Sequence, residues 1–575
     1  MPERTITLLT VQDHEGPIQG PAGALVECAD DAPWLPAGCV PITELLGSRE
    51  EAKKKAAKLV LELLEGEPEI DGVRHLYALK ETFIQAAMRH QLVLNLDNWL
   101  REHRIERCIF RVHSDLVDAL KQVRELTGSE YKAIAPATPK RGRLNAAREH
   151  LRDKGIVGIR ELPRLAIQRI SPLQSRMLQR HSAGPVVKGQ WWYYSTFYTF
   201  TKIGLAYERA LSKEFRFVTE LRGSAELPLN DAGRDWDDLY SFASRDDTPS
   251  KAYIEDTRKH LHQHMESATT HSPVARTLLL RSGEVHEFFS RLLPLTLLQT
   301  KTLKRFLVKA KPQLIVVGNE AWEGCLLQLA RAHGVPTIVL QHGILGDFYQ
   351  LTEHSGDVII VRGEFWKEFL SEESRARSVV LNCVPPVAKA ERKSQGTDLL
   401  FAVTEYKSQA FWHPADLDDM LEAAASAAFE AKCRLVIRTH PRDSVEPYRQ
   451  ALGRICSERK ISPEVAFSSG PGLEDAIRGS AVVLLYFSTV FLDCLRLGVP
   501  IVSPDWHHFA FKDMVRKHGV FHFARDLRGL RTLLSEGLAH KLPASSNHEQ
   551  FLAQTPQHEL QKFFEQLAST GGMRR

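Results

Sequence analysis

A histidine and a glycine follow a short apolar run near the middle of the chain. The run covers residues 337–340, and His342 and Gly343 lie just beyond it. A neutral imidazole accepts a proton from a hydroxyl near pH 7, so His342 is a candidate general base. Gly343 would let the backbone approach a substrate closely. The competing interpretation is a strand-end histidine that bonds only to its own loop.

Two carboxylates are further candidates for the same role. Glu320 follows the apolar run 313–318, in the same kind of position as His342, and Asp347 lies in the segment after His342. Either side chain could accept a proton, and Glu320 could instead bond to sugar hydroxyls.

Arg438, His440 and Pro441 end a second apolar run, which begins at residue 434. Arg438 and His440 are two residues apart, so in an extended segment their side chains point the same way. Pro441 would end the strand. An arginine beside a histidine suits a phosphate, or a nucleotide base with its ribose. The alternative is a strand end with a purely structural role.

Two hydroxyls, Ser488 and Thr489, lie where another apolar run passes into an amphipathic segment. Ser488 is a natural helix N-cap, but the same helix N-terminus could hold a phosphate with help from both hydroxyls. Asp493 is one turn further and could reach a ribose hydroxyl, or it could be an ordinary helix carboxylate. Thr404 and Glu405 follow a further apolar run and form another polar pair at a predicted strand end.

Short apolar runs alternate with amphipathic segments from about residue 276 onwards. Such runs are typical of parallel strands that are covered on both faces by helices. In these sheets ligands bind at the carboxyl ends of the strands, where helix N-termini favour phosphate. The predicted strands are residues 313–318, 337–340, 357–361, 378–382, 398–403, 434–438, 465–468, 481–487 and 500–503.

A polar segment without periodicity, residues 386–396, is the predicted linker. It separates a first domain, residues 1–385, from a second domain, residues 397–540. The predicted fold class is therefore α/β with two doubly wound units. We expect a helical or irregular insertion at about 135–310 in the first domain, and a polar tail at 541–575 that ends in a helix.

The composition is that of a globular protein, with 575 residues, 43% hydrophobic and 25% charged. This length predicts roughly two to four domains. The net charge of +4 does not by itself indicate a nucleic-acid partner. Neither a dinucleotide-binding nor a P-loop glycine motif occurs. The eight cysteines include no C-x-x-C pair, so they are predicted to be reduced, and no metal-ligand cluster is evident.

Residues 140–188 are strongly basic, and an aromatic block at 191–200 follows them at once. The favoured interpretation is a solvated helix face followed by a core element, and contact with an anionic membrane surface, which basic and aromatic residues suit, is the alternative. A nucleic-acid partner is the least favoured. No apolar stretch reaches the length of a membrane span, and the N-terminus reads as a strand, not a signal peptide. The predicted location is cytoplasmic, with peripheral association at the inner face of the membrane as an option.

These motifs resemble those of GT-B nucleotide-sugar glycosyltransferases. The closest likeness is to the bacterial surface-polysaccharide branch, which includes sialyltransferase-like and Kdo transferases that use CMP-sugars. In that branch a His-Pro histidine contacts the cytidine nucleotide and a Ser/Thr pair binds its phosphate, which correspond here to His440-Pro441 and Ser488-Thr489. The chain is also similar to CDP-glycerol glycerophosphotransferases, whose proposed base lies in a His-Gly pair matched by His342-Gly343.

The resemblance covers roughly residues 310–540 and implies a transferase with no cofactor and no required metal. The donor nucleotide would bind the C-terminal half, and a polysaccharide or lipid-linked glycan acceptor would enter from the N-terminal half. Three alternatives stay open. They are a glycerophosphotransferase, a sugar-nucleotide epimerase and a non-catalytic nucleotide-sugar-binding protein.

Overall fold

The structure is a computed structural model in which two compact parts of the chain can be distinguished. One unit comprises residues 1–49, 95–155 and 386–552, and the other comprises 50–94, 156–385 and 553–575. The described residues are 5–9, 24–26, 40–41, 49–104, 107–110, most of 120–134, 184–196, 198–220, 227–268, 285–286, 288–318, 323–341, 343, 345, 355–383, 396–403, 414–439, 444–469, 472–486, 488–506, 515–544 and 548–570.

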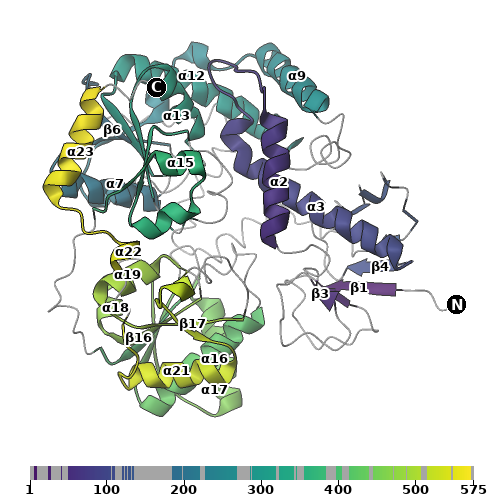
Figure 1. The fold of residues 1–575 in the computed structure, drawn as a ribbon, viewed down its shortest axis with the longest axis vertical. Coiled ribbons are helices and arrows are strands. Elements are labelled where there is room, and N and C mark those ends of the chain that lie inside the picture. Colours follow the sequence, from purple (N-terminus) through teal and green to yellow (C-terminus); the bar gives the residue numbers. More distant parts are fainter. Residues whose placement is uncertain are drawn as a thin grey trace. The chain divides into compact units, whose positions relative to one another are not determined.

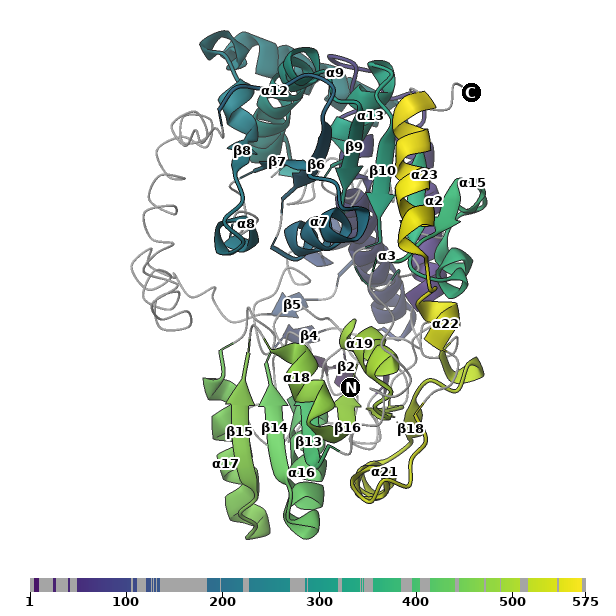
Figure 2. The ribbon, with the colours of Figure 1, turned by 90° about the vertical axis from the view of Figure 1, so that its left-hand side faces the viewer.

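Three parallel sheets share one strand order (Figures 1 and 2). In each sheet the first strand along the chain is internal, the next two lie on one side of it, and the fourth and fifth lie on the other. The described strand pairs in these sheets are parallel. This order is that of a doubly wound fold, with a switch point between the first and fourth strands.

The strands of each sheet are short. The five-stranded sheet contains β1 (Thr5–Leu9), β2 (Ala24–Val26), β3 (Val40–Pro41), β4 (Arg107–Phe110) and β5 (Lys132–Ile134). The seven-stranded sheet contains β6 (Trp191–Ser195), β7 (Arg216–Thr219), β8 (Trp236–Asp238), β9 (Leu314–Val317), β10 (Thr337–Leu340), β11 (Val358–Val361) and β12 (Ser378–Val380). The six-stranded sheet contains β13 (Asp398–Ala402), β14 (Arg434–Arg438), β15 (Glu464–Ser468), β16 (Ser480–Leu485), β17 (Ile501–Pro504) and β18 (His522–Ala524).

Two predicted doubly wound units are present, and a third parallel sheet, which the predicted domain division did not separate, lies within the first 134 residues. The sequence predicts one domain over residues 1–385, whereas this stretch supplies two separate sheets. Within the stretch 135–310, where an insertion was expected, β6, β7 and β8 lie in the same sheet as β9. The predicted linker lies almost wholly outside the described residues.

The aromatic block belongs to the core of the seven-stranded sheet. Trp191 and Tyr193 on β6 pack under α7 (Tyr198–Leu211) and the C-terminal helix α23 (Gln557–Thr570). Trp192 and Tyr194 pack on the opposite face, under α12 (Leu293–Ala310) and α13 (Gly324–Ala332). Strand alternation explains this division. These four rings are buried, which agrees with the interpretation of the block as a core element.

The basic stretch that precedes this block lies almost wholly outside the described residues, so its predicted role in membrane contact stays a prediction. No helix within the described ranges is long and apolar enough to cross a membrane.

Helices cover both faces of the six-stranded sheet, as buried apolar strands require (Figure 1). One face packs against α16 (Pro414–Ala431), α17 (Glu446–Arg459) and α21 (Leu527–Leu538). On the other side lie α18 (Leu473–Arg478) and α19 (Val490–Leu497). Further α-helices are α2 (Arg49–Leu64), α3 (Lys80–Glu102), α8 (Leu227–Asp231), α9 (Lys251–Ala268), α15 (Glu372–Ala376) and α22 (His548–Phe551).

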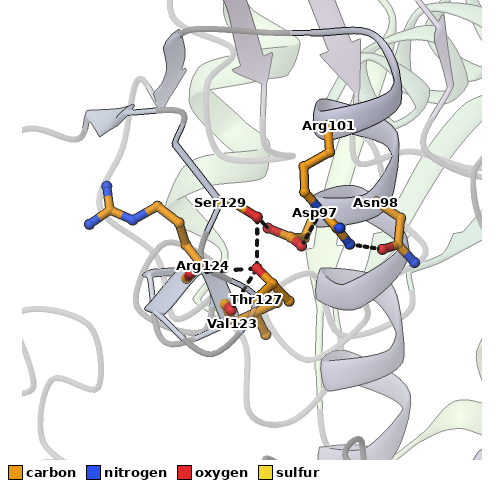
Figure 3. Close-up of polar contacts among 7 residues, drawn as sticks. All are labelled: Asp97, Asn98, Arg101, Val123, Arg124, Thr127 and Ser129. Carbon is orange, nitrogen blue, oxygen red and sulfur yellow. Dashed lines mark hydrogen bonds and ion pairs between the residues drawn. The ribbon is translucent and has the colours of Figure 1, made fainter.

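A buried carboxylate joins the end of α3 to the segment that leads into β5 (Figure 3). Asp97 is fully buried, and its two oxygens accept hydrogen bonds from Ser129 Oγ at 2.9 Å and Arg101 Nε at 3.1 Å. Thr127 shares a hydrogen bond with Ser129 at 2.7 Å. The charge is thus hydrogen-bonded, as a buried carboxylate must be. We assign Asp97 a structural role.

Close packing of α7 on β6 depends on a glycine. A Cβ on Gly204 would lie 2.8 Å from the ring of Tyr193, which is fully buried. We therefore expect Gly204→Ala to lower the free energy of unfolding by about 1–3 kcal/mol through overpacking, measured by urea denaturation. The control is Gly453→Ala on α17, where a Cβ meets nothing within 4 Å. Alanine should stabilise the helix there, and an equal loss in both variants would contradict the packing argument.

Candidate functional site

Polar side chains gather at the carboxyl edge of the six-stranded sheet. Its switch point lies between β13 and β16, with β14 and β15 on one side and β17 and β18 on the other. Ligands of doubly wound sheets bind outside the strands' carboxyl ends at such a point. The predicted residues Arg438, Ser488 and Thr489 all lie at or just beyond these ends.

Arg438, the last residue of β14, carries a buried positive charge. Its side chain is 7% exposed and its Nη1 donates a hydrogen bond of 3.3 Å to the hydroxyl of Ser468, the last residue of β15. Burial lowers the pKa of the Arg438 guanidinium, which nevertheless stays charged at neutral pH. Leu435 and Ile437 face the core under α16 and α17, so Arg438 lies on the opposite face.

The next residue, Thr439, is also buried, with 3% exposure. Its backbone N–H donates to the carbonyl of Ser468 at 3.0 Å, which continues the pairing of β14 with β15. Its hydroxyl makes no hydrogen bond within the described part of the chain. A buried hydroxyl without a partner costs free energy, so a hydroxyl in this position suits a hydrogen bond to a ligand or a water molecule.

The start of α19 differs in detail from the prediction. The residue in the N-cap position is Thr489, not Ser488, and its side chain does not cap the helix. The Ser488 hydroxyl instead accepts a hydrogen bond of 3.3 Å from the backbone N–H of Val490. The N–H groups of Phe491 and Leu492 bond to the carbonyls of Ser488 and Thr489. An anion here would therefore meet the helix dipole and the exposed Thr489 hydroxyl more than unbonded amides.

Asp493 belongs to a network on α18 and α19. Its carboxylate lies 3.7 Å from Arg496, whose guanidinium also pairs with Glu474 at 2.6 Å. Glu474 in turn accepts from Arg478 at 2.8 Å. These contacts favour the interpretation of Asp493 as a helix carboxylate over a ribose contact.

Gly343 lies at the end of β10, in the other unit. It is buried, and its carbonyl accepts a hydrogen bond of 2.8 Å from the side chain of Gln341. The same side chain accepts from the backbone N–H of Arg362 at 2.9 Å, so it links the ends of β10 and β11. The backbone at Gly343 is thus held in place at a strand end, as the sequence predicts.

Several predicted site residues lie outside the described part of the chain, and their roles stay predictions. They are His342, Glu320 and Asp347 among the candidate bases, and Thr404, Glu405, His440 and Pro441 among the nucleotide contacts.

Sequence reasoning missed a buried acidic cluster at the switch point of the seven-stranded sheet. Glu220, directly after β7, is fully buried and accepts hydrogen bonds from Tyr194 and Gln299. Glu323, at the start of α13, is 1% exposed and accepts from Thr196 at 3.2 Å. The strand signal at residues 216–219 is only four residues long and begins with an arginine, so the strand-end position of Glu220 was missed.

The described residues contain no group of three or more His, Cys, Asp or Glu side chains that could hold a metal ion. No protein-family model matches the chain, and no curated protein matches it.

Three solved structures illustrate the similarity of this chain to known proteins. S. aureus MnaA in a co-structure with UDP is 9% identical, with 66% of this chain and 97% of that chain covered and a TM-score of 0.42. UDP-GlcNAc 2-epimerase from Neisseria meningitidis bound to UDP-GlcNAc is 10% identical, covers 67% and 100%, and has a TM-score of 0.40. MurG from Acinetobacter baumannii is 12% identical, covers 66% and 99%, and has a TM-score of 0.39. At these TM-scores the similarities assign neither a family nor an activity.

Replacing the Thr439 hydroxyl tests whether this side chain contributes to the stability of the folded chain. Thr439→Val keeps the side-chain shape and removes a buried hydroxyl that bonds to nothing described, so we expect the free energy of unfolding to rise by about 1 kcal/mol. Ser468→Ala removes the partner of Arg438 and should lower it by a similar amount. Urea denaturation measures both, and a loss of stability in Thr439→Val would show that the hydroxyl has a structural partner.

Proposed function

We propose that this chain is a GT-B-type glycosyltransferase that moves a sugar from a nucleotide-activated donor to a glycan acceptor. The donor's nucleotide would bind at the carboxyl edge of the six-stranded sheet. A CMP-linked sugar is the proposed donor, and a cell-surface polysaccharide or lipid-linked glycan is the proposed acceptor. Both follow from the sequence resemblance.

One observation carries this proposal. A buried guanidinium, a buried hydroxyl with no described partner and the N-terminus of α19 share one edge of a doubly wound sheet around its switch point. Arginine is suited to bidentate phosphate contacts, and the positive end of a helix dipole favours the same charge. The arrangement therefore matches a ligand that joins a phosphate to hydroxyl groups, as a nucleotide does.

Each group would have its own part in binding. Arg438 would neutralise phosphate charge, Thr439 would donate or accept at a ribose or base hydrogen bond, and Thr489 would bond to a phosphate oxygen. Ser488 would keep the first turn of α19 in shape through its bond to Val490. His440 and Pro441, which follow Thr439 directly, would complete the contacts to the base.

The acceptor hydroxyl would need a base, because it must lose its proton as the glycosidic bond forms. His342, Glu320 and Asp347 stay the proposed bases. The two hydrogen bonds of the Gln341 side chain, to the Gly343 carbonyl and from the Arg362 N–H, would keep the neighbouring residue at a strand end, where ligands of such sheets bind.

Nucleotide binding tests the proposal through a thermal-shift panel of CMP, CDP, UMP, UDP and GDP. A ligand that binds only the native state raises the midpoint by mass action. We expect CMP or CDP to raise the thermal midpoint. Arg438→Gln should lower the affinity for that nucleotide about tenfold or more, because a charge-assisted hydrogen bond to phosphate is lost.

The matched control is Arg434→Gln, at the opposite end of the same strand. Arg434 is half-exposed and pairs with Asp398, so its loss should leave nucleotide affinity unchanged. A shift by UDP or GDP alone would overturn the cytidine donor but keep the site. Equal affinity of the Arg438 and Arg434 variants, or no shift with any nucleotide, would overturn the site itself.

A further inference from the structure

A cavity of about 420 Å³ opens beside the last two strands of the six-stranded sheet. Its described lining comes from the end of β17, the strand β18, and the helices that flank them: Asp505, Arg516, Phe521, His522, Phe523, Arg525 and Leu533. The volume lies in the range of small-molecule sites, which combine apolar and aromatic walls with a few polar groups. None of these residues belongs to the proposed nucleotide site.

Register places two of the charged groups side by side. Pro504 of β17 pairs with Ala524 of β18, and Asp505 N–H donates to the Ala524 carbonyl at 2.7 Å. Asp505 and Arg525 are therefore the first residues beyond the ends of two neighbouring parallel strands. Both face the same edge of the sheet on which the carboxyl ends of all six strands lie.

Arg516 is held in one orientation by two kinds of contact. Its Nη2 donates to both oxygens of Asp505, at 2.6 and 2.7 Å, and its guanidinium lies over the ring of Phe523 at 5.0 Å. A planar guanidinium fixed on a ring is preorganised, so little conformational entropy is lost when a ligand binds. Phe521 packs against Phe523 at 5.5 Å and extends the aromatic wall.

The charges of the lining select a particular ligand. Two arginines face one aspartate, so the described lining has an excess of one positive charge. This excess favours an anion, but the Asp505 carboxylate accepts hydrogen bonds and disfavours an ion that has only acceptors. A ligand with both an anionic group and hydroxyl groups can bond to the arginines through the first and to the Asp505 carboxylate through the second. The aromatic wall adds a preference for a ring with an apolar face.

We propose that this cavity binds an anionic monosaccharide, a pyranose that carries a carboxylate or a phosphate. Arg525 and Arg516 bind the anionic group, Asp505 accepts from the ring hydroxyls, and Phe523 packs against the apolar face of the ring. The inference does not rest on the proposed nucleotide site, because it uses a separate set of side chains.

The test measures binding of free sugars to the full chain by isothermal titration calorimetry. The probes are glucuronate and glucose 6-phosphate, with glucose as the neutral match and inorganic phosphate as the anion without a ring. We expect at least one of the two anionic sugars to bind with a millimolar Kd. Glucose and inorganic phosphate should bind about fivefold to tenfold more weakly. Binding of glucuronate would indicate a carboxylated sugar as the ligand, and binding of glucose 6-phosphate would indicate a phosphorylated one.

Arg525→Gln is the informative variant, because Arg525 is exposed and its replacement should not affect folding. This substitution should lower the affinity for the anionic sugar about fivefold to tenfold and leave the affinity for glucose unchanged. The control is Arg528→Gln, an exposed arginine three residues on that does not line the cavity. Phe523→Leu should lower the affinity for the anionic sugar and for glucose by the same factor.

Three results would overturn the proposal. One is the absence of binding by either anionic sugar at about 10 mM. Another is glucose or inorganic phosphate binding as tightly as the anionic sugars. The third is an Arg525 variant whose affinity equals that of the Arg528 control. Nucleotide affinity, read separately through the Arg438 variant, distinguishes failure here from failure of the proposed function.

Discussion

Parallel pairing of short apolar strands is the constraint from which the rest of the structure follows. Each parallel pair needs a crossover, and the crossover helices cover both faces of the sheet. The central strands of the two larger sheets are therefore buried and mostly apolar, as β9, β10 and β16 show. Polar chemistry is left to the strand ends. The strand order then opens one crevice in each sheet, where the crossovers change side.

Buried polar groups of different kinds lie near the switch points of the two larger sheets. The six-stranded sheet places a buried guanidinium, Arg438, near its switch point. The seven-stranded sheet places the buried carboxylates Glu220 and Glu323 near its own. Burying an ion is costly unless hydrogen bonds offset its lost hydration, and each of these ions has such bonds. The first crevice suits an anionic ligand, whereas the second suits one that offers hydrogen-bond donors.

Much of this architecture could be predicted because the signal is local. The apolar runs at residues 338–340 and 435–437 are each followed by polar residues, so both the strands and their ends are visible in the sequence. By contrast, β6 is a run of aromatic residues beside a basic stretch, and its place in the sheet depends on pairing with β9, far along the chain. The strands β7 and β8 are short and contain charged residues, so their pattern does not distinguish them from loops.

The candidate site, too, could be predicted from the sequence only in part. The positions of Arg438 and Thr489 at strand or helix ends follow from the sequence pattern alone. Their partners do not, because the bond between Arg438 and Ser468 depends on the register of β14 against β15. The cap of α19 shows the same limit, since backbone geometry places Thr489 and not Ser488 at the N-cap. The cavity beside β18 was also invisible, because the sequence predicts no strand at residues 522–524.

Hydrogen–deuterium exchange with and without CMP tests most directly the claim that the nucleotide binds at this edge. The account predicts slower exchange in peptides that cover the end of β14 and the first turn of α19, with α17 and the seven-stranded sheet unchanged. Protection confined to other segments, or no protection at a CMP concentration that shifts the thermal midpoint, would contradict it.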